Sequence, residues 1–311
     1  RVYPITVKEL KDAGTEYDTE DSKLNTGKYI GDKWGVKYVY APDIYVDLLA
    51  KNGEWTTLGK IVRPFFGLHT GLNDFYYVSG EIANQFKIEE EFLLPLISGP
   101  DEVQSFFVEK NKLNKRLFFC NKNKENLKKE KKIGALSYIE WGETQFTEKG
   151  QKREAGIPWP KVESVCDRKP GWWAIPKSKI KEGVLFLQYR TRVIFYTSLS
   201  QVPCISHVCF HIIQSNSDTE KIQRLHFYLN SSLAIFLREA QGRKYGGGGG
   251  PLESATIDWA RLPVSQLIFN INFNELLSII SKLEKRHPQS IFEECGIDPE
   301  SKIPIEEQEP K

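Results

Sequence analysis

Apolar residues in this 311-residue chain occur mostly in short runs that are rich in aromatic and β-branched side chains. Glycine, proline, asparagine or serine bounds most of these runs, which is typical of β-strands. The pattern predicts seven strands, at residues 58–66, 74–79, 116–120, 135–141, 171–175, 184–196 and 205–213.

Helical spacing of apolar residues occurs mainly late in the chain. Asp218 or Thr219 can cap a helix that runs to about residue 241, with Ile222, Leu225 and Leu229 on one face. A second helix is predicted over residues 274–286 and a short one over residues 79–84. The predicted fold class is therefore α+β, a β-rich domain with long C-terminal helices.

Charge is balanced overall but unevenly distributed. The chain has 43 lysines and arginines against 41 acidic residues, which excludes a histone-like polycation. Residues 109–132 contain ten lysines and arginines against three glutamates. That stretch is either a solvated loop or a region that binds the DNA backbone. Residues 291–311 are acidic and predict a frayed tail.

Further features bear on location and completeness. Five scattered cysteines do not suggest a disulfide framework, and no segment predicts a signal peptide or a membrane span. The expected location is the cytoplasm. The sequence contains no methionine, and we expect it to be a fragment that starts within a longer protein.

The densest set of possible metal ligands is Cys204, His207, Cys209 and His211. Zinc sites usually take their ligands as two separated pairs from turns, and here a second pair is missing. We therefore favour an ordinary strand with small buried thiols over a metal site, and expect no metal ligands in this chain.

Five consecutive glycines, residues 246–250, follow Arg243, Lys244 and Tyr245. A nucleotide P-loop instead follows a strand and ends in Gly-Lys-Ser/Thr before a helix. One alternative is a helix cap with a flexible connector. The other is a cradle for a nucleic-acid phosphate, in which glycine amides approach the anion and Arg243 and Lys244 supply charge.

Two further sets combine cations with aromatic residues. Arg190 and Arg192 alternate on a predicted strand, so they are either exposed or ion-paired surface arginines, or readers of guanine edges or phosphates. Arg168 and Lys169 precede Trp172 and Trp173. One of these rings is expected in the core, and the other packs on a sugar or base, in the core or at a protein interface.

One ordered series of segments resembles a known family. The series includes Thr70-Gly71-Leu72-Asn73, Leu93-Leu94-Pro95, Gly171-Trp172-Trp173, Tyr228-Leu229-Asn230-Ser231, Lys244-Tyr245-Gly246-Gly247 and Arg261-Leu262-Pro263. It is similar to the C-terminal target-recognition domain of TaqI-like adenine-N6 DNA methyltransferases of type II restriction–modification systems, including fused restriction–methylation enzymes. More distantly, it resembles the specificity subunits of type I systems. The five-glycine run is longer than is usual in that family.

The resemblance implies how the parent protein is organised. Residues 1–49 would be an extension from an absent catalytic domain, residues 50–265 the recognition domain, and residues 266–311 a C-terminal helix and acidic tail. S-adenosylmethionine would bind the absent domain, whose signature is Asn/Asp-Pro-Pro followed by an aromatic residue. No such signature occurs here, so this chain alone is expected to have no catalytic residues.

The resemblance also implies double-stranded DNA and a catalytic domain in cis as partners, while the oligomeric state stays open. It places Thr70, Gly71 and Asn73 at the DNA-facing edge, with the segment from Lys244 to Gly247 nearby. The expected DNA-binding residues are Thr70, Gly71, Asn73, Arg168, Lys169, Trp172, Arg190, Arg192, Arg243, Lys244, Tyr245, Gly246 and Gly247. The alternatives are a protein-interaction module or a type I specificity subunit.

Overall fold

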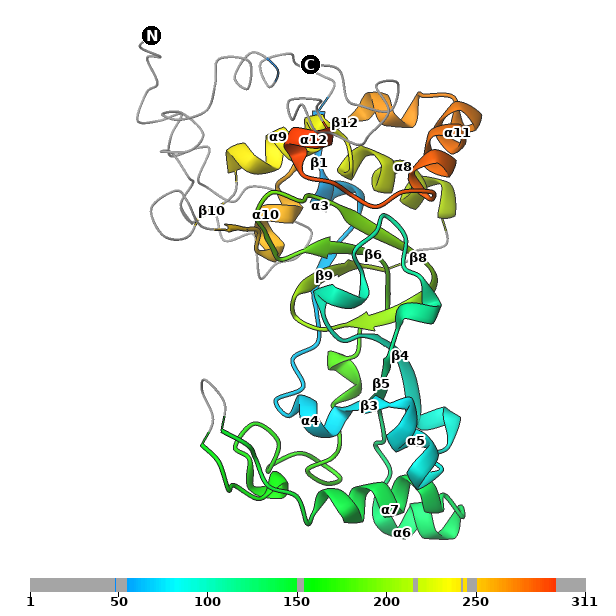
Figure 1. The fold of residues 1–311 in the computed structure, drawn as a ribbon, viewed down its shortest axis with the longest axis vertical. Coiled ribbons are helices and arrows are strands. Elements are labelled where there is room, and N and C mark those ends of the chain that lie inside the picture. Colours follow the sequence, from blue (N-terminus) through cyan, green and yellow to red (C-terminus); the bar gives the residue numbers. More distant parts are fainter. Residues whose placement is uncertain are drawn as a thin grey trace.

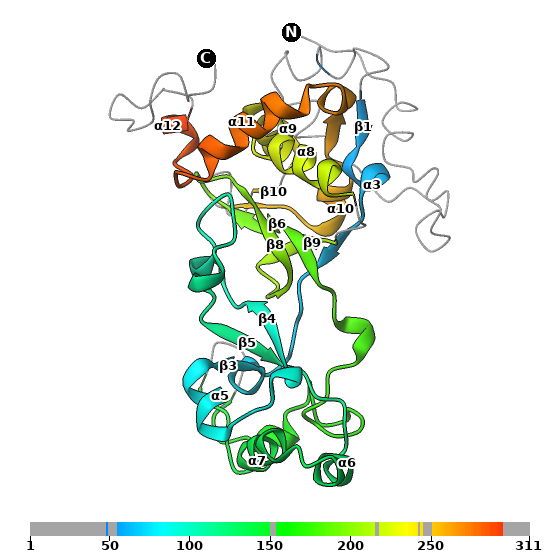
Figure 2. The ribbon, with the colours of Figure 1, turned by 90° about the vertical axis from the view of Figure 1, so that its right-hand side faces the viewer.

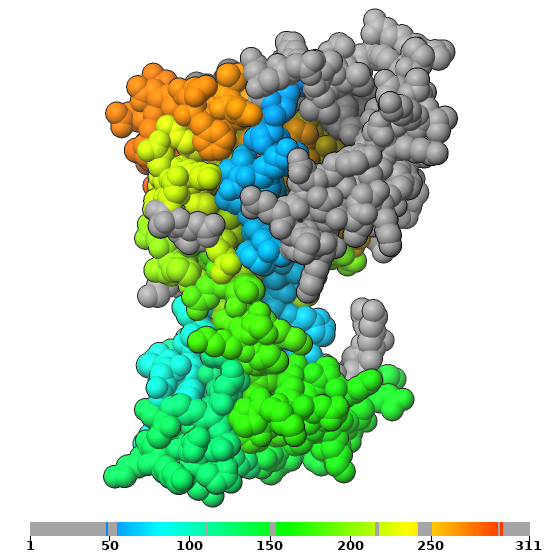
Figure 3. All heavy atoms as spheres, turned by 180° about the vertical axis from the view of Figure 1, so that it is seen from behind, coloured from blue at the N-terminus to red at the C-terminus, as the bar shows by residue number. Residues whose placement is uncertain are grey.

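The computed structural model describes residues 48, 55–149, 154–214, 218–241, 243–244 and 251–294, and for residues 110, 243, 244 and 292 only the backbone. The described part forms an upper and a lower lobe joined by a narrower waist (Figures 1 and 2). Seen from behind, the waist is visibly thinner than the lower lobe (Figure 3). The expectations for residues 1–47, 245–250 and 295–311 fall outside the described residues.

A mixed seven-stranded sheet passes through the waist and links the lobes. In spatial order its strands are β2 (Pro64–Phe66), β9 (Phe210–Ile213), β6 (Gly183–Gln188), β8 (Thr197–Ser206), β4 (Leu93–Ile97), β5 (Lys115–Phe118) and β3 (Tyr77–Ser79). All neighbours are antiparallel except β4 and β8, which pair in parallel through Leu96 with Ile205 and Ile97 with Ser206. This sheet, with its helices, confirms the α+β class.

Two small sheets lie in the upper lobe. The first pairs β1 (Trp55–Thr57) with β12 (Pro263–Ser265). The second has the order β10 (Arg243–Lys244), β11 (Leu252–Glu253) and β7 (Arg190–Thr191). The second sheet brings together two segments that the sequence marked as candidate DNA contacts, although more than fifty positions separate them.

The lower lobe packs helices around an aromatic core. They are α4 (Asn73–Tyr76), α5 (Gly80–Phe86), α6 (Lys124–Lys129) and α7 (Ile133–Gly142), with the short η2 (Glu90–Phe92), η3 (Pro100–Glu102), η4 (Lys110–Lys112), η5 (Trp159–Lys161) and η6 (Lys177–Lys179) nearby in sequence. Phe75 lies at the centre of the core and stacks on Tyr138 with ring centroids 5.0 Å apart. The Trp172 ring lies 4.4 Å from Phe75 on another side.

The upper lobe is mainly helical. Its helices are α3 (Leu58–Ile61), α8 (Thr219–Leu229), α9 (Ser232–Gln241), α10 (Thr256–Ala260), η7 (Gln266–Phe269), α11 (Phe273–Leu283) and α12 (Ile291–Glu294). Leu276 and Ile280 of α11 are buried in the same core as Leu225 of α8. The buried Arg224 guanidinium also donates to the carbonyl oxygens of Ile268 and Ile271, both at 2.8 Å, so α11 belongs to the folded upper lobe.

Two predicted strands are not strands. Residues 135–141 lie in helix α7. Most of this helix is buried, so its sequence lacks the amphipathic pattern that would have indicated a helix. The Glu89 carboxylate accepts the N–H groups of Gly134 at 3.1 Å and Ala135 at 2.9 Å and so caps this helix from a distant segment. Residues 171–175 form a buried turn in which Trp172 and Trp173 pack into the core.

Other predicted elements are divided. The predicted helix over residues 218–241 breaks at Asn230, whose side chain accepts the N–H of Thr197 at 2.8 Å and donates to its carbonyl oxygen at 3.1 Å. The predicted strand at 184–196 ends at Gln188 before β7, and the one at 205–213 contains the turn between β8 and β9. Residues 58–61 and 73–76 are short helices that lead into β2 and β3. Helices α5 and α11 confirm their predictions.

Candidate nucleic-acid interface

The loop between β2 and α4 is tightly held by the segment around Ser164. Gly71 has φ +81°, a conformation that favours glycine, and a Cβ atom there would lie 2.5 Å from Ser164 Oγ. Ser164 Oγ donates to the Gly71 carbonyl oxygen at 3.0 Å. At the start of the loop, a Cβ atom on Gly67 would lie 2.2 Å from the His207 carbonyl oxygen. Glycine at both positions therefore allows the backbone to approach closely.

Thr70 stabilises this loop from inside. Its side chain is buried, its hydroxyl donates to Asn73 Oδ1 at 2.5 Å, and it accepts the N–H of Leu72 at 3.2 Å. The Thr70 hydroxyl is thus engaged within the loop, whereas Asn73 is exposed. Of the expected contact residues in this loop, Asn73 is the one whose side chain faces solvent.

Arg168 also has a structural position. Its guanidinium donates to the carbonyl oxygens of Thr70 at 2.5 Å and Ala174 at 3.2 Å and to the Tyr76 hydroxyl at 2.8 Å. It lies over the Tyr76 ring, 5.3 Å from the centroid. Lys169, the next residue, is exposed. The arrangement makes Arg168 a link between two loops and leaves Lys169 accessible.

Trp172 and Trp173 are each only 6% exposed. The Trp173 indole donates to the Lys122 carbonyl oxygen at 3.2 Å, and Trp172 packs against Phe75. The expectation that one of the two rings is in the core therefore applies to both of them. Neither ring is available on the surface to stack on a base or to form a partner site.

Arg190 is exposed and ion-paired. Its Nε donates to Glu253 Oε1 at 2.6 Å, and its Nη2 lies 2.5 Å from the same oxygen. Its guanidinium also lies 5.4 Å from the ring centroid of Tyr189. Across the small sheet, the backbone of Glu253 is opposite Arg190 on one side and opposite Arg243 on the other. Lys244 is opposite Leu252, while Tyr245, Gly246 and Gly247 lie outside the described residues.

Arg192 lies in a bend just after β7 and is exposed. The strand expected from the sequence ends at Thr191, so the alternation that put both arginines on one sheet face does not extend to Arg192. The residue between the two arginines, Thr191, is buried, whereas both arginine side chains are exposed. Both cationic side chains are therefore exposed, and that of Arg190 is paired with Glu253.

Aromatic rings connect this arginine segment to the loop before α4. Phe66, the last residue of β2, is 48% exposed, and its ring lies 5.9 Å from Tyr189 and 5.2 Å from His211, centroid to centroid. Phe66 leads directly into residues 67–73, and Tyr189 directly precedes Arg190. We use the name waist surface for the exposed or partly exposed side chains of Phe66, His69, Asn73, Tyr189, Arg190 and Arg192. In Figure 1, β10 and the segment before α4 lie on the same side of the waist.

Buried polar groups support the waist surface from behind. His211 is fully buried and, because Nε2 lies 2.8 Å from the Ser254 carbonyl oxygen, Nε2 carries the proton and donates. Its Nδ1 then accepts from the Thr256 hydroxyl at 3.2 Å. Burial lowers the pKa of His211 to about 4, so the ring is neutral at physiological pH. These bonds attach β9 to the segment that follows β11.

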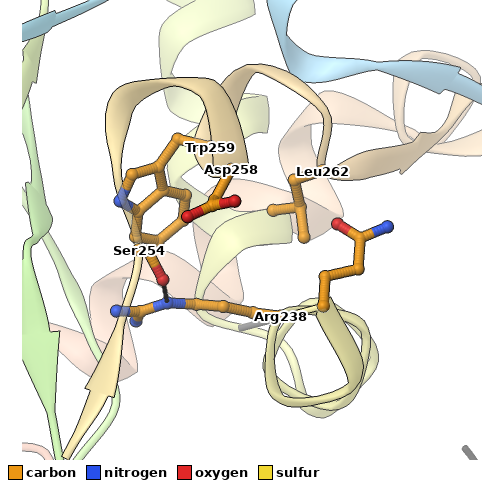
Figure 4. A pocket seen from close by; sticks show the side chains of 6 residues that line it. Arg238, Ser254, Asp258, Trp259 and Leu262 are labelled. Atoms are coloured by element: carbon orange, nitrogen blue, oxygen red, sulfur yellow. Dashed lines mark hydrogen bonds between the residues drawn. The ribbon is translucent and has the colours of Figure 1, made fainter. Parts of the chain in front are cut away.

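Arg238 of α9 holds the same segment. Its Nε donates to Ser254 Oγ at 3.0 Å, its Nη2 donates to the Gln188 carbonyl oxygen at 3.1 Å, and its guanidinium lies 4.3 Å from the Trp259 ring centroid (Figure 4). Burial lowers the pKa of Arg238 to about 9. No local pattern in the sequence signals this role, because Arg238 occupies an ordinary helical position.

The basic stretch at residues 109–132 is extensively ion-paired. Its pairs are Lys112–Glu109, Arg116–Glu90, Lys122–Glu130, Lys124–Glu143 and Lys132–Glu91. Helix α6 of this stretch lies at the far end of the lower lobe (Figure 1). Pairing with glutamates reduces the field that DNA phosphates would experience, which favours the interpretation as a solvated surface.

The cysteine and histidine set has other roles. Cys204 is buried and its thiol lies 3.4 Å from the Val202 carbonyl oxygen, His207 Nδ1 accepts the N–H of Cys209 at 3.4 Å, and His211 bonds to Ser254. Within the described ranges, no three histidine, cysteine, aspartate or glutamate residues are grouped to hold a metal ion. Among the helices that the structure describes, none is long and apolar enough to cross a bilayer.

Comparison with known proteins identifies the family. Residues 43–293 match the family model described as "Type II methyltransferase M.Eco57I, C-terminal domain", and the chain belongs to that family. The matched range includes both lobes and the waist. A restriction–modification methyltransferase is therefore the class of protein to which the domain is related.

Two relatives place the domain within larger proteins. The chain is 28% identical over 205 residues to the type II methyltransferase M.AccI of Acinetobacter calcoaceticus, over 62% of this chain and 33% of the relative. In fold it is similar to the type IIG restriction endonuclease BpuSI, with a TM-score of 0.53 and 10% identity over 76% of this chain and 27% of that chain. The chain thus spans about a third of the length of M.AccI.

Proposed function

We propose that this chain recognises the DNA target for a restriction–modification methyltransferase. The observation that carries the proposal is the waist surface, where the partly exposed Tyr189 contacts both the exposed Phe66 and the exposed Arg190 beside the loop of residues 67–73. Aromatic rings with adjacent cations are suited to bases and phosphates. Membership in the family of methyltransferase C-terminal domains supports the same function.

Methyl transfer itself would take place in a different part of the parent protein. The resemblance to adenine-N6 methyltransferases implies an S-adenosylmethionine-binding domain that acts on an adenine. The present chain would supply affinity through cations and backbone amides and sequence choice through a few contacts to base edges. Placing the domain beside double-stranded DNA and a catalytic domain in cis is part of this proposal.

The structure refines which residues we propose for contact. Asn73, Lys169, Arg190 and Arg192 are exposed and remain in the set. We assign Gly71 the backbone conformation of its loop, and Arg243 and Lys244 remain candidates by their position in β10. The buried or bonded Thr70, Arg168 and Trp172 are instead proposed to hold these loops in place.

Duplex binding as a function of salt tests this function. Because phosphate contacts release counterions, the affinity for a labelled duplex should fall by at least about tenfold between about 50 and about 200 mM salt. The chain with S-adenosylmethionine should transfer no methyl group to the duplex. An affinity that is independent of salt, or no binding at low salt, would contradict the proposal. Binding to a protein partner instead would favour the interaction-module alternative.

A further inference from the structure

The ion pair between Arg190 and Glu253 is asymmetric in its exposure. The side chain of Arg190 is 58% exposed, whereas that of Glu253 is only 11% exposed. Both Nε and Nη2 of the arginine approach the single oxygen Oε1. The carboxylate is therefore shielded behind a guanidinium that is presented to solvent.

The backbone fixes this pair independently of the side chains. Glu253 is opposite Arg190 in the antiparallel pairing of β11 with β7. The N–H of Ser254 donates to the Tyr189 carbonyl oxygen at 2.9 Å, and Arg238 and His211 bond to Ser254 from behind. The backbone of Glu253 is thus held in place by the buried hydrogen bonds of the next residue, Ser254. Its carboxylate can therefore fix the orientation of the Arg190 guanidinium.

A carboxylate in this position is unfavourable for simple binding of a polyanion. Its charge opposes DNA phosphates and offsets part of the attraction from Arg190. A cation needed only for affinity would therefore bind better without Glu253. The contribution that a shielded carboxylate can make is to orient the guanidinium and reduce the entropy lost when it contacts a base.

The geometry is compatible with one particular base. The contacts with Glu253 involve Nε–H and one N–H of Nη2, two of the five N–H donors of arginine. The guanidinium is a planar fork of donors, and the Arg190 side chain that carries it is largely presented to solvent. Two parallel donors match the O6 and N7 acceptors of guanine in the major groove.

We propose that Glu253 is a specificity-determining residue that positions Arg190 to read a guanine. This inference rests on the proposed function, because it requires the chain to bind DNA. It makes Arg190 a base reader and not merely a phosphate contact, and it assigns Glu253 a role through Arg190 without contact to the DNA.

Selection from a randomised duplex library tests the proposal, because it works without a known target sequence. The unaltered chain should enrich a sequence containing a guanine. Glu253→Gln should reduce the preference for one guanine by about tenfold while leaving or raising the affinity for non-selected duplexes. Arg190→Lys keeps the charge but loses the planar fork of donors. It should reduce the preference for guanine at the same position, while the dependence of affinity on salt stays as in the unaltered chain.

Glu143→Gln is the matched control, since Glu143 pairs with Lys124 in the lower lobe, away from the waist surface. It should leave the selected sequence unchanged. Retention of every guanine preference by Glu253→Gln would overturn the inference while leaving DNA recognition intact, as would loss of preference at different positions in the two variants. Absence of DNA binding by the unaltered chain would overturn the proposed function itself. Binding without any sequence preference would overturn the role of Glu253 and the recognition part of that function, leaving only nonspecific DNA binding.

Discussion

Arg168 donates to the carbonyl oxygen of Thr70 at 2.5 Å and so joins two loops that are 98 positions apart in the chain. The same guanidinium bonds to Ala174 and Tyr76, so its donors are directed into the protein. An arginine that was expected to contact DNA is therefore a structural bridge beside the waist surface.

Replacing Arg168 by alanine should lower the free energy of unfolding by about 2–4 kcal/mol, because partly buried acceptors lose a charged donor. Urea denaturation of the two proteins measures this change. At a temperature where the variant is folded, the dependence of DNA affinity on salt should stay the same. A flatter salt dependence without loss of stability would instead mean that Arg168 contacts phosphate.

Arg192→Ala should weaken binding to all duplexes alike and reduce the salt slope by about one phosphate contact. The reason is that Arg192 is exposed on the bend beside β7. Anisotropy titrations at several salt concentrations provide the slope. Lys129→Ala is the control, because Lys129 is also exposed but lies in α6 at the far end of the lower lobe. Equal effects of the two substitutions would contradict a localised interface.

Phe66→Ala should reduce duplex affinity by about tenfold, or about 1.4 kcal/mol, because the exposed ring would lose its apolar contact with base edges in a groove. Phe66 is 48% exposed beside Tyr189. The matched control is Phe146→Ala in the lower lobe, where the side chain is 58% exposed. We expect unchanged binding for that control. If both substitutions act equally, exposed apolar area and not position explains the effect.

Stability should fall on acidification between about pH 6.5 and pH 4. Burial lowers the pKa of His226 to about 4 even though its Nε2 lies 2.8 Å from the Phe106 carbonyl oxygen. Within that range the unfolded chain binds a proton that the folded chain excludes, so stability rises with pH. The contribution of this one histidine is about 3 kcal/mol.

Urea denaturation at several pH values measures this dependence. His226→Gln should lower stability at neutral pH and also flatten its decline between pH 6.5 and 4 relative to the unaltered chain. Acidic residues titrate in both proteins, so the difference between the two curves isolates His226. Parallel curves would show that His226 titrates normally in the folded protein.

The sequence predicted several local features correctly because their causes are local. Asp218 accepts the N–H of Lys221 and caps α8, and Ser79 caps α5 in the same way. Amphipathic spacing located α11. One of the two interpretations of Arg190 was a surface arginine that is exposed or ion-paired. The structure shows that Arg190 is exposed and is also ion-paired with Glu253.

Other features depend on contacts between distant segments. Glu89 caps α7 from a different part of the chain. Helix α8 ends at Asn230, whose side chain forms hydrogen bonds with Thr197 of β8. Likewise, nothing local marks Glu253 as the partner of Arg190, because β11 and β7 meet only in the folded chain. Apolar runs also cannot distinguish a strand from a helix that is buried on most sides, which is why the pattern predicted a strand where α7 lies.

The seven-stranded sheet has a mechanical consequence. Because β4 and β8 pair directly, the two lobes are connected by continuous backbone hydrogen bonds and not by a linker. Opening or closing one lobe against the other would have to break or bend this ladder. The two lobes should therefore keep a fixed distance and orientation. Any change of shape on binding should occur in the bound duplex or in neighbouring domains.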